Sequence, residues 1–205
     1  RYKESVDWIV QVPPPWRVFI YDASETRLPV PLREHTQIHS ISNAGQEPRA
    51  YLEHIQRRRL FADLADVTVF AQAQPFEHCT QNGNFIERLK HLQAEPPADF
   101  FPLGDLDQCG ADSRMVRRVE RFHIKSPHIQ YGPEPLKDFC AYMGLTCPEK
   151  IQFPFGAIFA VPRELIVCRS TEYFARLMSL VDHAPLVYEA AVLERLWPVV
   201  LGKES

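Results

Sequence analysis

Three short apolar runs constrain the fold of this chain more than any other feature of its sequence. Val18–Tyr21, Val67–Ala71 and Ala157–Val161 are rich in β-branched or aromatic residues and are bounded by polar residues or proline. Runs of this length and composition are typical of strands that are buried on both faces. We therefore expect these three segments to form buried strands.

The segments between the runs carry helical periodicity. Glu47–Leu60 and Asn84–Gln93 each place apolar residues on one face, and Asn84 is a good helix cap. A helix capped by Thr171 and a last helix that carries Trp197 complete the pattern. Strands that alternate with helices favour an α/β fold, with a mainly parallel twisted sheet and helices on both faces.

Length and charge limit the other possibilities. A chain of 205 residues with 45% hydrophobic content is expected to form a single domain spanning residues 1–205. The net charge of -3 provides no broad basic field, so nucleic acid is not an expected partner. Charges and prolines interrupt every apolar run, so we expect no membrane span. Residues 96–135, rich in proline, glycine and charge, predict a long surface excursion.

The five cysteines are odd in number and scattered along the chain. This usage favours reduced thiols and a cytoplasmic location, and no ligand spacing for zinc is present. Because the sequence begins at Arg1 rather than Met, a targeting segment upstream stays possible.

The residues that follow the middle apolar run are the first place to look for chemistry, because ligands of α/β sheets bind at the carboxyl ends of the strands. Gln72-Ala73-Gln74 follows that run directly, and Phe76 and His78 come next. Amide side chains there predict directed hydrogen bonds to a neutral ligand.

The sequence resembles a poorly characterised fungal and bacterial family of glycosyltransferase-like domains, over nearly the whole chain. The resemblance implies a single-domain fold of the glycosyltransferase-A type. It rests on these segments: Arg1-Tyr2-Lys3-Glu4, Asp7-Trp8, Ile20-Tyr21, Asn43-x-Gly45-x-Glu47, Tyr51-Leu52, Leu64–Phe70, Gln72, Pro75-Phe76-x-His78, Pro102-Leu103-Gly104, Gly156-Ala157-x-Phe159-Ala160-Val161, Arg163-Glu164 and Glu194–Pro198.

Two departures from that family change what the resemblance implies. The family usually has arginine at the position of Gln46 and aspartate at the position of Gln74, where related enzymes hold a divalent ion in an Asp-x-Asp motif. Neutral amides supply no charge for a hard cation, so we expect neither a metal nor another cofactor. A second Asp-x-Asp, Asp105-Leu106-Asp107, is interpreted as solvated loop carboxylates, with Asp105 capping a short turn.

The candidate site combines amides, titratable groups and aromatic residues. Each has a plain structural alternative: Gln72 and Gln74 as strand caps, Glu47 in a first helical turn, His78 on loop carbonyls, Glu194 on a helix surface, and the aromatic residues as core. The candidate catalytic residues are Gln72, Gln74, His78, Glu47 and Glu194, and the candidate substrate-binding residues are Tyr21, Asn43, Gln46, Phe76, Phe155, Phe159 and Trp197.

These residues lead to three functional hypotheses. The first is a metal-independent enzyme of secondary, natural-product metabolism that performs a cyclisation, a pericyclic reaction or another tailoring step on a largely apolar or partly oxygenated small molecule. The second is a sugar-nucleotide-dependent glycosyltransferase in which Asp66, Asp105 or Asp107 supplies the missing charge. The third is a ligand-binding protein without catalytic activity.

Overall fold

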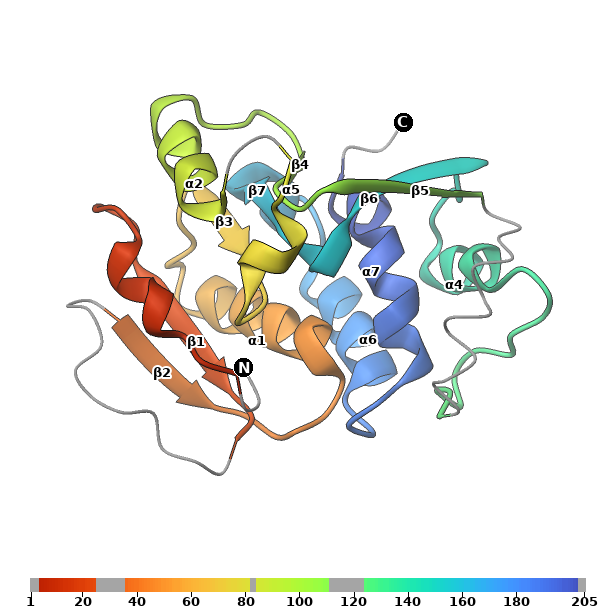
Figure 1. Cartoon of the computed structure of the whole chain (residues 1–205). Coiled ribbons are helices and arrows are strands. Elements are labelled where there is room, and N and C mark those ends of the chain that lie inside the picture. The colour runs from red at the N-terminus through yellow and green to blue at the C-terminus, as the bar shows by residue number, and fades with distance from the viewer. Residues whose placement is uncertain (1–3, 25–35, 82–83, 111–123, 203–205) are drawn as a thin grey trace.

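A computed structural model describes residues 4–24, 36–81, 84–110 and 124–202 (Figure 1). In chain order its elements are η1 (Asp7–Gln11), β1 (Val18–Asp22), β2 (Thr36–Ser40), α1 (Gln46–Leu60), β3 (Val67–Phe70), η2 (Pro75–His78), α2 (Phe85–Ala94), β4 (Phe101–Pro102), β5 (Leu106–Gly110), α4 (Pro135–Met143), β6 (Lys150–Pro154), η3 (Phe155–Ala157), β7 (Phe159–Pro162), α5 (Arg163–Val167), α6 (Thr171–Val181) and α7 (Tyr188–Leu201).

The strands form three small sheets. β1 pairs with β2 in parallel, β7 lies between β3 and β4 and is antiparallel to both, and β5 pairs with β6 in the antiparallel sense. The expectation of a mainly parallel sheet of the glycosyltransferase-A type is therefore wrong. The expectation fails for two reasons. The third apolar run forms β7, which is antiparallel to β3, and β1 and β3 do not pair with each other.

The secondary structure of the apolar runs and of the early helices follows the sequence closely. The first two runs form β1 and β3, and Asn84 caps α2 by accepting a hydrogen bond from Glu87 N at 3.1 Å. β7 begins two residues later than expected, because Gly156 and Ala157 have positive φ angles of 67° and 50°. The cap of α6 is Ser170 rather than Thr171, since the Ser170 hydroxyl accepts from Tyr173 N at 3.1 Å.

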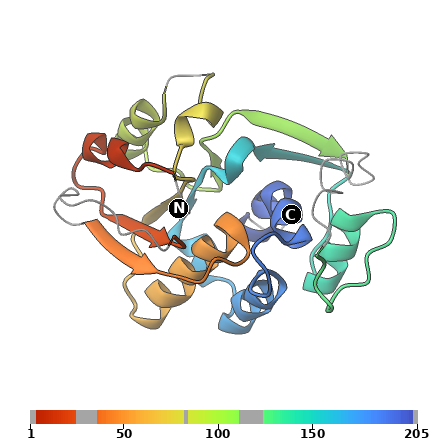
Figure 2. The same ribbon diagram turned by 60° about the horizontal axis from the view of Figure 1, so that its bottom comes forward.

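Helices pack against both sides of β3 and β7, as the two views of the molecule show (Figures 1 and 2). On one side α1, α6 and α7 form the largest hydrophobic cluster, in which Phe159 and Trp197 are completely buried. On the other side α2 and η1 pack over Ile158 and Ala160. The aromatic residues Phe159 and Trp197 therefore belong to the core.

The predicted surface excursion over residues 96–135 contains strands that the sequence pattern did not indicate. β4 and β5 both lie within it, and β5 forms a ribbon with β6 that extends toward α4 (Figure 1). Part of the excursion, residues 111–123, lies outside the described residues.

The cysteines and helices bear on two further expectations. All five cysteines are free thiols. Among the described residues, no helix is both long and apolar enough to cross a membrane. The compartment in which the protein works stays a prediction from the sequence.

Candidate functional site

The first turn of α1 is fixed by an unusual backbone. Gly45 and Gln46 have positive φ angles of 63° and 54°, and Gly45 N donates to Ala184 O at 2.8 Å. A Cβ at Gly45 would lie 2.5 Å from Val181 O, so only glycine fits against the end of α6. This packing fixes the first turn of α1, which carries the partly exposed Glu47.

Gln72 links Glu47 to the end of β3. Its Nε2 donates to Glu47 Oε1 at 2.8 Å. His78, in η2, stacks on Phe155 with ring centroids 6.4 Å apart and an angle of 20° between the ring planes. Gly156 packs against these groups so closely that a Cβ there would lie 2.5 Å from His78 Cδ2 and 3.3 Å from Gln72 Nε2.

A second carboxylate reaches the same point from α7. Gly156 N donates to Glu194 Oε1 at 3.2 Å, and Arg195 Nη1 lies 3.2 Å from Glu194 Oε2. The Arg195 side chain is buried and also donates to Ala191 O at 2.6 Å. Glu194 therefore has one backbone partner and one buried cationic partner, and is more than a surface helix charge.

The two carboxylates differ in their electrostatic environment. Burial raises the pKa of Glu47; the hydrogen bond from its own backbone N–H opposes this, the charge of Glu194 adds to it, and the bond from Gln72 opposes it further. Burial also raises the pKa of Tyr51 well above its usual range, and the charges of Glu47 and Glu194 add to that shift. Two nearby carboxyl groups in unlike surroundings are a recurring arrangement for acid and base catalysis.

A cavity of about 420 Å³ reaches Gln72, the hydrogen-bond partner of Glu47, although neither Glu47 nor Glu194 lines it. It lies between β1 and β3, and Tyr51 and Gln72 form part of its wall. Apolar side chains such as Ile20, Phe70 and Leu89 line most of the remainder. Its size and lining are typical of pockets for small organic ligands.

Tyr21, a predicted substrate-binding residue, pairs on the wall of the cavity with His54, which was not predicted from the sequence. The Tyr21 hydroxyl lies 3.2 Å from His54 Nδ1, and both residues are buried and line the cavity. Burial, together with the charge of Arg58, lowers the pKa of His54 to about 4, so its ring is neutral near pH 7. The signal was available, because His54 lies one helical turn after Tyr51 on the same face of α1.

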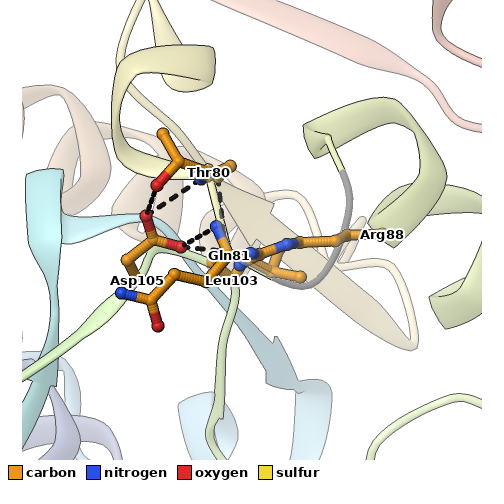
Figure 3. A network of polar contacts seen from close by, with 6 residues as sticks. Thr80, Gln81, Arg88, Leu103 and Asp105 are labelled. Carbon is orange, nitrogen blue, oxygen red and sulfur yellow. Dashed lines mark hydrogen bonds and ion pairs between the residues drawn. The ribbon is translucent and has the colours of Figure 1, made fainter.

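Asp105 connects the loops that carry His78 and Phe155, and Figure 3 shows the contacts of its side chain with Thr80, Gln81 and Arg88. Its backbone N donates to His78 O at 2.6 Å, and its backbone O accepts from Phe155 N at 2.9 Å. Its carboxylate accepts from Thr80 Oγ1 at 2.6 Å and forms an ion pair with Arg88 at 3.2 Å. Only 10% of the side chain is exposed, so the interpretation of Asp105 as a solvated carboxylate is wrong.

Hydrogen bonds set the charge state of Asp105. Burial alone would raise the pKa of this carboxyl. Bonds from the Thr80 side chain, from the Thr80 and Gln81 backbone N–H groups and from Arg88 outweigh that effect and lower the pKa to about 2. The negative charge of Asp105 is therefore neutralised by its hydrogen bonds and by its ion pair with Arg88.

The structure brings together some of the residues singled out in the sequence and separates others. Glu47, Gln72, His78, Phe155 and Glu194 converge around Gly156. The others lie elsewhere: Gln46 is half-buried at the start of α1, Tyr21 lies on the cavity wall, Asn43 and Gln74 are exposed, Phe76 packs on Trp8 and Phe85, and Phe159 and Trp197 lie in the core.

Within the described ranges, no three His, Cys, Asp or Glu side chains are grouped in a way that suits a metal ion. The expectation of chemistry without a metal stays a prediction.

The fold and site define an α/β protein with small mixed sheets and a carboxylate pair beside an apolar cavity. The chain belongs to the family described as Protein of unknown function (DUF3431), whose model matches residues 1–205. Comparison with curated proteins and with solved structures gave no match. None of these comparisons supports the expected relationship to glycosyltransferases.

Proposed function

We propose that the protein is an enzyme that acts on a small, largely apolar molecule, with Glu47 and Glu194 as its acid and base. The observation that carries this proposal is the convergence of two unlike carboxyl groups on Gln72 and Gly156, next to a cavity with apolar walls. An ion pair on the protein surface does not need a second carboxyl group or a nearby cavity, whereas proton transfer to and from a bound molecule needs both.

The reaction that fits these groups is a cyclisation or another tailoring step of natural-product metabolism. Glu194 accepts a proton from an activated atom of the substrate, a new bond forms to a carbonyl carbon, and the carbonyl oxygen takes a proton from Glu47. The raised pKa of Glu47 favours the protonated form that this role requires. General acid and base groups each contribute roughly 10²- to 10⁴-fold in rate.

Gln72 and the cavity supply orientation. The Gln72 amide is held by Glu47 at 2.8 Å and reaches the cavity wall, so it fixes a substrate oxygen relative to the acid. Holding a reactive conformer lowers a barrier by on the order of 7 kcal/mol or more. A pericyclic step, which needs shape more than proton transfer, would use this part of the site alone.

Sugar transfer from a nucleotide donor, to which the sequence resemblance points, has weaker support. Asp105 was one of the residues proposed to replace the missing charge, but its carboxylate is engaged by Thr80, Gln81 and Arg88. We keep this reaction as an outcome of the test below, together with ligand binding without catalysis.

The test is untargeted mass spectrometry of a metabolite extract incubated with the protein. Because Gln is isosteric with Glu, Glu47→Gln and Glu194→Gln remove acid and base character with little change in shape. We expect each to slow product formation by about 100-fold or more. Glu149→Gln, at an exposed position after α4, is the matched control and should behave as the wild type.

Three outcomes would contradict the proposal. Full activity in both Gln variants would show that the carboxylates do no chemistry. Consumption of a nucleotide sugar would establish the glycosyltransferase alternative. Retention of a metabolite without conversion by wild-type protein would leave the ligand-binding alternative.

A further inference from the structure

The cavity between β1 and β3 lies edge-on to both strands. Side chains of a strand alternate between two faces, so a cavity on one face of a sheet is lined by every second residue. Here consecutive residues line it, 18–21 of β1 and 67–70 of β3. Phe19, Val67 and Val69 are only half-buried, and they lie in strands at the edges of their sheets. We call this space the slot.

Hydrogen bonds on the far edge of β3 show which backbone groups face the slot. Asp66 O accepts from Arg163 N at 2.8 Å, so the backbone of Asp66 points toward β7. Alternate residues of a strand direct their N–H and C=O groups to opposite edges. Val67 and Val69 therefore direct theirs into the slot, where no strand of the described residues pairs with them.

The same reasoning applies to β1. Asp22 O accepts from Ile41 N at 3.0 Å, so the backbone of Asp22 points toward β2. Counting back along the strand, the N–H and C=O of Phe19 point away from β2 and into the slot. The slot thus has backbone donors and acceptors on both of its long walls.

Both walls run in the same direction. Arg17, which precedes β1, pairs with Asp63, which precedes β3, at 3.1 Å. At the other end, Tyr21 and Phe70 both contact His54, with ring centroids 5.8 Å and 5.9 Å from it. A chain that enters the slot therefore forms the same type of ladder with each wall, parallel with both or antiparallel with both.

Unpaired backbone groups beside apolar side chains cost free energy unless water or a ligand binds them. An apolar ligand without donors would leave them unsatisfied. A chain with alternating N–H and C=O groups satisfies both edges at once, which is how extended peptides add to open sheets.

We infer that the slot binds an extended amide-bearing chain, a peptide or peptide-like molecule, as an additional strand between β1 and β3. This inference rests on the proposed function and names its substrate class, because Gln72, which lines one end of the slot with Tyr51, donates a hydrogen bond to Glu47. The reacting part of the chain lies at that end, and the remainder is held along the strands.

The test uses the whole protein and a capped tetrapeptide, acetyl-Val-Ala-Val-Ala-amide, which spans about 13 Å in the extended form. Its control is the same peptide with the nitrogens of all four residues methylated, which keeps the side chains and removes the four backbone N–H donors. Amide exchange measured by NMR reports on Phe19, Val67 and Val69, with Leu177 of α6 as a reference in the core.

In the free protein we expect the amides of Phe19, Val67 and Val69 to exchange at least about 100-fold faster than that of Leu177. Addition of the tetrapeptide at millimolar concentration should slow their exchange at least about tenfold. The methylated peptide should bind at least about tenfold more weakly, because several hydrogen bonds are lost.

Each other result overturns the inference. Protection of these amides in the free protein means that β1 and β3 pair directly in solution. Equal binding of both peptides means an apolar pocket without backbone recognition, and binding of neither means that the slot takes no peptide. Peptide binding is measured by amide exchange in the wild-type protein, whereas catalysis is measured by product formation, so a failure of the proposed catalysis and a failure of peptide binding are seen separately.

Discussion

Gly156 is the residue on which the geometry of the candidate site depends most. Its φ angle of 67° favours glycine, and the missing side chain makes room for His78 and Gln72. The sequence contained this glycine within a matched segment but gave no sign of its neighbours. Contacts between residues 78 and 156 depend on how β3 and β7 pair, which local pattern does not determine.

Gly156→Ala should therefore be more costly than a change of backbone preference alone. A left-handed conformation costs an L-residue about 1–2 kcal/mol, and here the new Cβ would also meet His78 at 2.5 Å. We expect a loss of about 2–4 kcal/mol in the free energy of unfolding, measured by urea titration.

Gly144→Ala is the matched control for this substitution. Gly144 has a similar φ angle of 71°, yet no atom lies within 4 Å of the position of its Cβ. It should lose only about 1 kcal/mol. Equal losses in the two variants would mean that contact between residue 156 and His78 does not matter.

Asp105→Asn tests the network that holds His78. The folded pKa of about 2 lies below the usual 3.8, so this carboxylate stabilises the protein above pH 4, and the effect is lost as the pH falls toward 2. The variant should be less stable by about 1–2 kcal/mol at pH 7, allowing for solvent screening. Thermal unfolding at pH 7 should show a melting temperature lower by about 2–8 °C.

The pH dependence provides the control for Asp105. The difference between Asp105→Asn and the wild type should shrink between pH 4 and pH 2. A constant difference for Asp105→Asn over this range would contradict a role for its charge.

At the scale of elements, the sequence predicted those segments in which hydrophobic periodicity is strong. α1, α2, β1 and β3 all appear close to their expected bounds, because each buries a wide apolar stripe. β2 and β5 were not predicted from the sequence, because only one of their residues, Cys109, is buried and their composition is largely polar. The expectation of a mainly parallel sheet was wrong for a different reason: the pairing of strands is decided by contacts between residues far apart in the sequence.

The N-cap of α6 shows that local sequence rules locate a helix end only to within one residue. Ser170 and Thr171 are both good capping residues, and the choice depends on which one precedes the first helical turn. Ser170→Ala should destabilise the protein by about 1 kcal/mol, because Tyr173 N loses its partner. Chemical denaturation should detect this loss, whereas Thr171→Ala should change stability by less than about 0.5 kcal/mol.

On the scale of the whole molecule, the slot separates two parts of unequal burial. β2 has no buried residue, and β1 has three, whereas every residue of β7 is buried. Elements with few buried contacts open at lower free energy than the core. Native-state hydrogen exchange should therefore report a smaller opening free energy for β1 and β2 than for β7 and α7.

A uniform opening free energy across these elements would contradict this division. Ligand binding offers a further check, because a molecule that bridges β1 and β3 stabilises the folded state by roughly 2.7 kcal/mol at a concentration 100 times its Kd. That gain should appear mainly in the opening of β1 and β2.

The placement of the slot has a consequence for how proteins of this kind diverge. The carboxylates stand on α1 and α7 within the largest hydrophobic cluster, while one wall of the slot is β1, whose partner strand β2 is largely exposed. Substitutions at Phe19 or Tyr21 can change which molecule fits without disturbing Glu47 or Glu194. Descendants of one ancestor could thus acquire new substrates by varying a single strand while inheriting the same reaction.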